Sequence, residues 1–212
     1  MSLSEHMRTH QLSERSNMIN WLCHTRGYTT YLEIGTHQQH KCFDRVCAPV
    51  KHSVDPGVES ATDTPMFRMT SDEFFEQNQM CYDIIFIDGL HEHEQVWRDM
   101  NHAWHALNHD GVIVCHDMSP QLQQHQTRAR ENPTGLWNGD CWHAWMQARH
   151  ERENWSMCVV DVDFGVGVIE AGEQQLLNVP ESEWTWSGLQ RNRVEWLNLI
   201  DMDQWKMRMI RG

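Results

Sequence analysis

The sequence predicts an α/β fold with a doubly wound, mostly parallel sheet, and three observations support this prediction. An unbroken apolar run at 84–87 stops abruptly at Asp88 and Gly89, which is typical of a strand buried on both faces. A second apolar run within 110–117 ends in polar residues in the same way. Between the two, 92–107 carries apolar residues at three- and four-residue spacing and predicts an amphipathic helix. Strands that alternate with helices in this order favour a parallel sheet.

The elements ahead of these strands follow the same alternation. Residues 1–26 are predicted to be helical, with a stop at Gly27. The apolar stripe of this helix consists of Met18, Ile19, Leu22 and Cys23. Short strands are expected at 31–35 and 51–56, and a weaker strand at 66–69. A helix is expected to begin within 70–73, because Thr70 or Ser71 can accept a hydrogen bond from the first free helical amides.

The segment 118–139 is the longest stretch without a regular pattern. It is rich in proline, glycine and glutamine and follows directly after a strand. Long irregular loops in compact domains are usually functional lids or disordered. We interpret this one as an active-site lid because of its position.

The last third of the chain is expected to complete the sheet and add helices. A helix is predicted at 140–149, and the apolar runs at 156–163 and 165–170 predict a hairpin at the sheet edge. The tail 181–212 is helical in pattern, and its apolar positions are Trp196, Leu197, Ile200 and Trp205. No repeat or low-complexity tract is evident. We therefore expect 1–212 to be a single domain, with 1–27 as an N-terminal helical segment.

Composition excludes several classes of function. The formal net charge is −13, with 30 acidic against 17 basic residues and no basic patch, so a nucleic-acid partner is not expected. Seven cysteines without a C-x-x-C pair argue against a zinc site or a disulfide framework and favour the cytoplasm. The first twenty residues are polar, and no apolar run approaches the roughly 20 residues that span a bilayer. Neither a signal peptide nor a membrane partner is therefore expected.

Three acidic residues stand at the ends of predicted strands. Glu33 precedes Gly35, Asp55 lies about 20 residues after that turn, and Asp88 ends the strand of 82–87. In nucleotide-binding α/β proteins an acid at the second of these places binds the ribose hydroxyls. Ligands of open α/β sheets lie beyond the carboxyl ends of the strands, so these residues are candidates for a site.

With these motifs, the chain resembles the class I S-adenosylmethionine-dependent methyltransferases, in the bacterial branch whose fourth strand ends in Ile-Asp-Gly-x-His and which is similar to metal-dependent small-molecule O-methyltransferases. The matching segments lie at 31–35, 54–56, 70–75, 86–91, 111–117, 137–140 and 163–169. The resemblance implies a Rossmann-like seven-stranded sheet with an antiparallel edge hairpin. It also implies methyl transfer to a hydroxyl of a small molecule, with a sugar as one candidate acceptor. A homo-oligomer is left open.

The same resemblance assigns the cofactor-binding residues. It implies that Glu33 and Gly35 lie against the methionine end of S-adenosylmethionine, and that Asp55 binds its ribose. It further implies that Ser71, Asp72 and Asp88 bind the cofactor, the first two near the adenine and Asp88 at the reacting centre. One departure is that bulky residues follow Gly35, where the family has a glycine-rich loop. The alternative is a non-catalytic Rossmann-like binding module that has lost the cofactor.

Catalysis and metal binding are expected around Asp88. In the resembling metal-dependent enzymes, an acid of the fourth strand and an acidic pair after the fifth bind magnesium, which here corresponds to Asp88, His116 and Asp117. Because magnesium prefers oxygen ligands, the one nitrogen ligand either weakens the site or shifts its preference toward manganese, iron or zinc. The alternative is that His116 only closes its strand. His91 is the candidate general base beside Asp88, since an imidazole titrates near neutrality, and an exposed helix-cap histidine is its alternative.

Two further motifs can be explained without a catalytic role. The Asp-Phe-Gly segment at 163–165 is not accompanied by the other motifs of protein kinases, so it is not interpreted as a metal motif. The tryptophans Trp137, Trp142 and Trp145 flank the predicted lid. They can stack on a flat acceptor or anchor helices.

Overall fold

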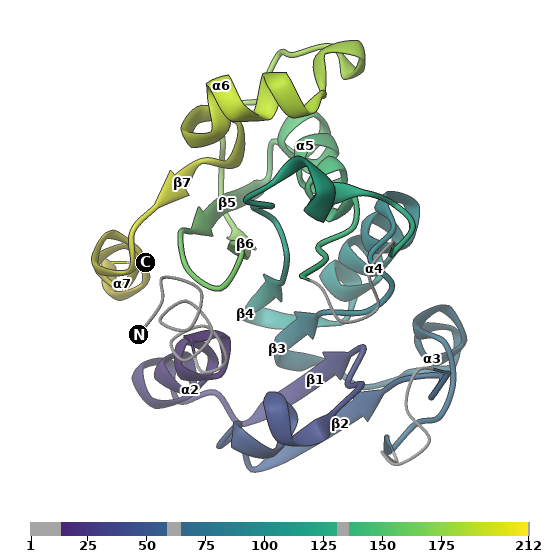
Figure 1. Cartoon of the computed structure of the whole chain (residues 1–212). Coiled ribbons are helices and arrows are strands. Elements are labelled where there is room, and N and C mark those ends of the chain that lie inside the picture. Colours follow the sequence, from purple (N-terminus) through teal and green to yellow (C-terminus); the bar gives the residue numbers. More distant parts are fainter. Residues whose placement is uncertain (1–13, 59–64, 131–135, 212) are drawn as a thin grey trace, which may run out of the picture.

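A seven-stranded sheet forms the centre of the computed structural model, which describes residues 14–58, 65–130 and 136–211 (Figure 1). The strand order is β2-β1-β3-β4-β6-β5-β7. The strands are β1 (Thr30–Ile34), β2 (Val50–Val54), β3 (Tyr82–Ile87), β4 (Leu107–Cys115), β5 (Trp155–Val160), β6 (Val166–Ala171) and β7 (Leu199–Ile200). The first four pair in parallel, β6 is antiparallel to both β4 and β5, and β7 is parallel to β5. This is the Rossmann-like fold that the sequence predicts.

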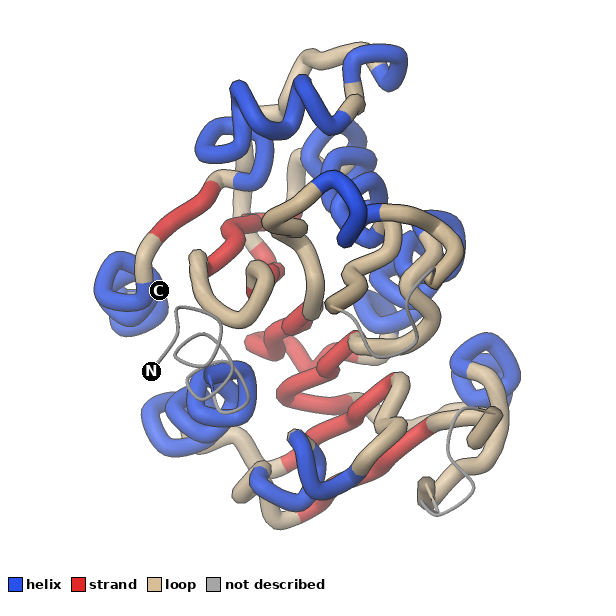
Figure 2. The backbone as a smooth tube through the Cα atoms, in the orientation of Figure 1, coloured by secondary structure: helices blue, strands red, loops and turns tan. Residues whose placement is uncertain are grey.

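Helices cover both faces of the sheet (Figure 1 and Figure 2). They are α2 (Glu14–Arg26), α3 (Ser71–Gln77), α4 (His93–His105), α5 (Cys141–Glu151), α6 (Trp186–Leu197) and α7 (Met202–Arg211), with short 3-10 turns η1 (Gln39–Lys41), η2 (Phe43–Arg45), η3 (Gln123–Gln126) and η4 (Glu181–Glu183). Side chains of β3 alternate between the faces: Ile85 packs with α4 and α5, while Phe86 packs with α2 and α7. None of the described helices is both long and apolar enough to span a membrane.

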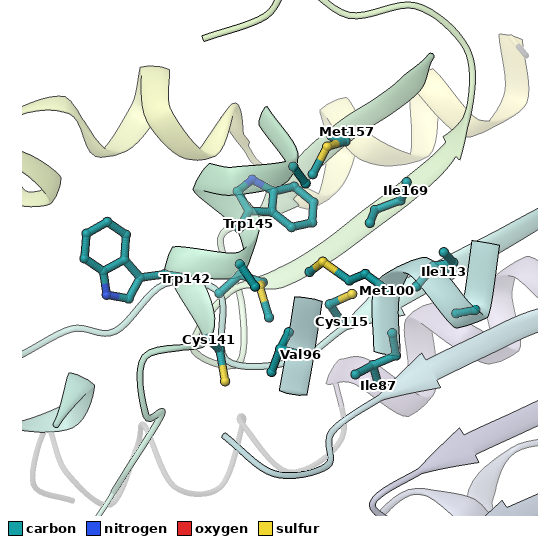
Figure 3. Close-up of a cluster of buried hydrophobic side chains, with 14 of the residues drawn as sticks. Ile87, Val96, Met100, Ile113, Cys115, Cys141, Trp142, Trp145, Met157 and Ile169 are labelled. Carbon is teal, nitrogen blue, oxygen red and sulfur yellow. The ribbon is translucent and has the colours of Figure 1, made fainter. Parts of the chain in front are cut away.

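The core between the sheet and α4 and α5 is densely apolar (Figure 3). Val96 and Met100 come from α4, and Trp142 and Trp145 from α5, and all four are at most 3% exposed. Trp142 and Trp145 are therefore helix-packing anchors, which was one of the two interpretations of these tryptophans. This core packs α4 and α5 against one face of the sheet.

The helix starts and stops follow local chemistry. Thr70 is the N-cap of α3 and forms a capping box with Glu73, so the first of the two predicted capping residues is the correct one. Gly27 ends α2 with a φ of +67°, as predicted for the stop.

Three expectations about the sheet need correction. Residues 66–69 are not a strand, because only Phe67 bridges to Val54 before the chain turns away into α3. The seventh strand is β7, which lies outside β5, so the predicted hairpin is one strand away from the edge. Ile200 belongs to β7 and not to a helix. The cause is Asn198, which ends α6 in a left-handed conformation and turns the chain alongside β5.

Candidate functional site

The carboxyl ends of the four parallel strands meet at one edge of the sheet. The Gly35 amide donates to the carbonyl of Val54 at 2.8 Å, and the Asp88 amide donates to that of Ile34 at 2.9 Å. The His116 amide continues the ladder by donating to Ile87 at 2.9 Å. These bonds extend the pairing one residue beyond the strands. They therefore fix the backbone just beyond the strands, where Asp88 and His116 carry polar side chains.

A group of six side chains, which we call the carboxylate–histidine cluster, forms at this edge. Its members are Arg15, Asp88, His91, His116, Asp117 and Asp163. The shortest approaches between acid and imidazole are 3.2 Å, from His116 Nδ1 to Asp88 Oδ1 and to Asp117 Oδ2. Asp88 is central, because Arg15, His91 and His116 all approach it. Sequence analysis predicted four of the six members.

Asp88 is ionised in this environment. Burial alone would raise the pKa of Asp88, but His116 and the guanidinium of Arg15 outweigh it and hold this pKa well below its ordinary value. A fixed negative charge therefore stands at the end of β3, beside the carboxyl end of β1.

His91 lies between two carboxylates. Its Nε2 is 3.4 Å from Asp88 Oδ1, and its Nδ1 is 3.4 Å from Asp117 Oδ2. Burial opposes protonation, but the charges of Asp117 and Asp88 prevail and raise the pKa of His91. Nδ1 makes no hydrogen bond among the described residues. The ring is thus oriented through Asp88 and has one nitrogen able to accept a proton.

Part of 118–139 packs directly against His91. The indole of Trp137 stacks on the imidazole, with ring centroids 4.8 Å apart. The Asn138 side-chain amide donates to Asp117 Oδ1. Gly139 has a φ of +60°, and a Cβ there would lie 1.9 Å from the carbonyl oxygen of His91. The described part of the predicted lid therefore contributes a wall of the site, and its opening and closing remain a prediction.

Arg15 and Asp163 are the cluster members that sequence analysis missed. Arg15 Nη1 lies 2.8 Å from His116 Nε2 and donates to Asp163 Oδ2 at 3.3 Å. Asp163 belongs to the Asp-Phe-Gly segment, which was not expected to take part in a site, and its φ is +46°. A signal for Arg15 did exist. It precedes Met18 by three residues and Ile19 by four, which places a charge on the buried stripe of α2.

Glu33 interacts electrostatically with Asp88 and Arg15 of the cluster and is 2% exposed. The Tyr31 hydroxyl donates to Glu33 Oε2 at 2.5 Å. Burial raises the pKa of Glu33 to about 8, even though the Tyr31 hydrogen bond lowers it. This carboxyl group is therefore largely protonated at neutral pH.

We expect Glu33→Gln to stabilise the protein, and increasingly so as pH rises. In the unfolded chain Glu33 ionises near its ordinary pKa of 4.5, whereas the folded protein holds the proton until about pH 8. Stability is therefore lost across this window as pH rises, by up to about 3 kcal/mol at pH 7. Urea unfolding of both proteins at pH 5 and pH 7.5 measures the difference. A difference that does not change with pH would contradict this account of Glu33.

The remaining predicted cofactor residues are held by backbone and helix contacts. Asp55 accepts hydrogen bonds from the amides of His37 at 2.9 Å and Gly57 at 2.6 Å, and so fixes the loop after β1. Gln95 of α4 donates to Ser71 Oγ at 3.1 Å and to Asp72 Oδ1 at 3.2 Å. Asp55 thus holds the loop after β1, whereas the side chains of Ser71 and Asp72 accept hydrogen bonds from α4.

The edge offers suitable groups for a cofactor and a metal ion. Thr36 Oγ1 is buried beside Gly35 and has no hydrogen-bond partner among the described residues, so it can bind a polar ligand group. Asp88, His116 and Asp117 each place one ligand atom within 4.8 Å of the others. Neighbouring ligands of an octahedral ion are about 3 Å apart, close to the two 3.2 Å separations at His116. The positions of these residues therefore suit both a bound cofactor and a metal ion.

Comparisons with known proteins support the fold. A family model described as a methyltransferase domain matches residues 18–118. No curated protein sequence matches the chain. A solved structure of a candidate O-methyltransferase from Klebsiella pneumoniae is 12% identical with a TM-score of 0.56, and the match covers 76% of this chain and 80% of that chain. SAH-bound PaMTH1, a methyltransferase from Podospora anserina, is 14% identical with a TM-score of 0.55, over 75% of this chain and 78% of that chain.

At such identities the likeness to solved structures shows the fold alone, and the family model covers residues 18–118. Residues 18–118 are thus similar to a methyltransferase domain, and the chain has the fold of methyltransferases of known structure. Both findings agree with the family resemblance noted in the sequence.

Proposed function

We propose that the protein transfers a methyl group from S-adenosylmethionine to a hydroxyl group of a small molecule. The observation that carries this proposal is the position of His91 between Asp88 and Asp117, at the carboxyl edge of a methyltransferase sheet. When bound, S-adenosylmethionine supplies an activated methyl group on a sulfonium. The residues need only align the acceptor and remove its proton.

In this proposal the residues at the carboxyl edge of β1, β2 and β3 would hold the cofactor. Glu33 and Gly35 border its methionine end, and Asp55 binds the ribose. The carboxylate of Asp88 attracts the positive sulfonium. Ser71 and Asp72 border the adenine, which requires them to keep their contacts with Gln95 of α4.

His91 is the proposed general base. Asp88 holds its Nε2 side, and Nδ1 takes the proton from the acceptor hydroxyl. Asp117 stands 3.4 Å from Nδ1 and stabilises the imidazolium that forms. The indole of Trp137 restricts the ring to this orientation by stacking on it.

A metal ion at this site would be held by Asp88, His116 and Asp117. If bound there, such an ion would supply Lewis-acid polarisation of an acceptor oxygen. Manganese tolerates the nitrogen ligand better than magnesium does. The proposed base does not depend on this ion, since His91 can act with or without it.

Transfer of a radiolabelled methyl group from S-adenosylmethionine tests this function. The purified protein is incubated with catechols, flavonoids and sugar-containing acceptors, each with manganese or with EDTA. We expect label in at least one hydroxylated acceptor and none in acceptors whose hydroxyl groups are already methylated. Equal labelling of blocked and free acceptors would overturn hydroxyl transfer.

A further inference from the structure

Arg15 is the only arginine or lysine among the described residues that enters the carboxylate–histidine cluster. It is 8% exposed and reaches the cluster from α2, on the face of the sheet opposite to α4 and α5. Its guanidinium lies 3.8 Å from Asp88 Oδ2 and 3.3 Å from Asp163 Oδ2. Arg15 thus already supplies a positive charge to two of the three aspartates at this edge.

The contact between Arg15 and His116 fixes where the imidazole carries its hydrogen. Arg15 Nη1 lies 2.8 Å from His116 Nε2, and an arginine nitrogen can only donate. Nε2 therefore accepts, and the ring hydrogen lies on Nδ1. There it points at Asp88 Oδ1 and Asp117 Oδ2, each 3.2 Å away. In this arrangement Nδ1 has no lone pair to offer to a metal ion.

Metal binding requires the opposite arrangement. Nδ1 must present its lone pair between the two carboxylates, and the hydrogen must move to Nε2. Asp163 Oδ1 lies 3.4 Å from Nε2 and can accept that hydrogen, as carboxylates commonly do for metal-binding histidines. Arg15 opposes metal binding in two ways. Its N–H group points at His116 Nε2, so the hydrogen cannot move there. Its positive charge also repels a cation held by Asp88 and Asp117.

We propose that Arg15 is the resident cation of this site and that, while seated, it excludes a divalent metal ion from Asp88, His116 and Asp117. The proposal concerns the site of the proposed function but does not rest on methyl transfer. It makes Arg15 a positioning residue, which acts through the orientation of the His116 hydrogen.

Manganese binding by Arg15→Met tests the proposal, because methionine keeps the length of the side chain and removes both its charge and its N–H groups. Free Mn²⁺ is followed by electron paramagnetic resonance during titration of the full chain. We expect Arg15→Met to bind one Mn²⁺ per chain with a Kd about tenfold or more below that of the wild type. Adding His116→Ala should abolish this gain, which locates it at the cluster.

Arg26→Met is the matched control. Arg26 lies on the same helix, but it pairs with Glu170 at 2.8 Å and donates to the Tyr28 hydroxyl and the Met209 carbonyl, which lie outside the cluster. We expect its manganese affinity to equal that of the wild type. Equal affinity of wild type and Arg15→Met would overturn the proposal, as would tight wild-type binding that His116→Ala removes.

The wild-type protein provides a test that needs no Arg15 variant. Long-range ¹H–¹⁵N spectra distinguish a protonated from an accepting ring nitrogen, and the His116→Ala spectrum assigns the signal. We expect Nδ1 of His116 to carry hydrogen and Nε2 to be an acceptor. Hydrogen on Nε2, whether or not Nδ1 also carries one, would contradict the proposal even if Arg15→Met failed to fold.

Discussion

His91→Ala is expected to reduce methyl transfer by about 10²- to 10⁴-fold, the usual contribution of a positioned general base. The affinity for S-adenosylhomocysteine (SAH) should stay within about twofold of the wild type, because His91 is proposed to act on the acceptor. The rate of label transfer and a calorimetric titration with SAH measure the two effects separately. A wild-type rate for His91→Ala would remove His91 from the mechanism.

His93→Ala is the control for this experiment. His93 lies two residues further on, but its Nε2 meets Gln147 Oε1 at 2.9 Å and its amide donates to Asp140, so its contacts are structural. Its replacement should leave the rate unchanged. Since the pKa of His91 is raised and a base must be unprotonated, the wild-type rate should also rise with pH through a value above 6.5. This rise should be lost in His91→Ala.

Gly35→Ala is expected to destabilise the protein by about 3 kcal/mol or more. The φ of Gly35 is +83°, and a Cβ there would lie 2.2 Å from the carbonyl oxygen of Asp88. Backbone cannot move aside as a flexible side chain can, so the ends of β1 and β3 must separate. Denaturant unfolding measures the loss of stability.

Gly27→Ala separates the two causes of this loss. Gly27 also has a positive φ, +67°, but a Cβ there meets nothing within 4 Å. Its replacement should cost only the conformational strain, about 1–2 kcal/mol. Equal losses for Gly27→Ala and Gly35→Ala would show that the close approach of β1 and β3 is not what requires glycine.

The sequence predicts most of the sheet because buried parallel strands have a strong local signal. The apolar run of β3 and the polar residues after it mark both the strand and its functional end. The prediction of a strand at 66–69 was wrong because only one residue of this segment, Phe67, pairs with β2, through Val54. β7 was missed because two residues carry no periodicity, and a left-handed Asn198 decides their path.

The candidate site was predictable where its residues follow strands directly. Asp88, His116 and Asp117 come together because parallel strands end at one edge. Arg15 and Asp163 are 148 positions apart, and their contact depends on how α2 packs on the sheet. No local pattern encodes such a contact. A charge within an apolar helical stripe indicates only that the charge needs a buried partner.

A calorimetric titration of the wild-type protein with SAH tests the central claim most directly, because Gly35 is followed by bulky residues and not by a glycine-rich loop. Our account predicts saturable binding of one SAH per chain, since Asp55 holds this loop through His37 and Thr36 Oγ1 has no partner among the described residues. A folded protein that gives no binding signal with SAH would contradict it. That result would favour the alternative of a methyltransferase fold that has lost its cofactor.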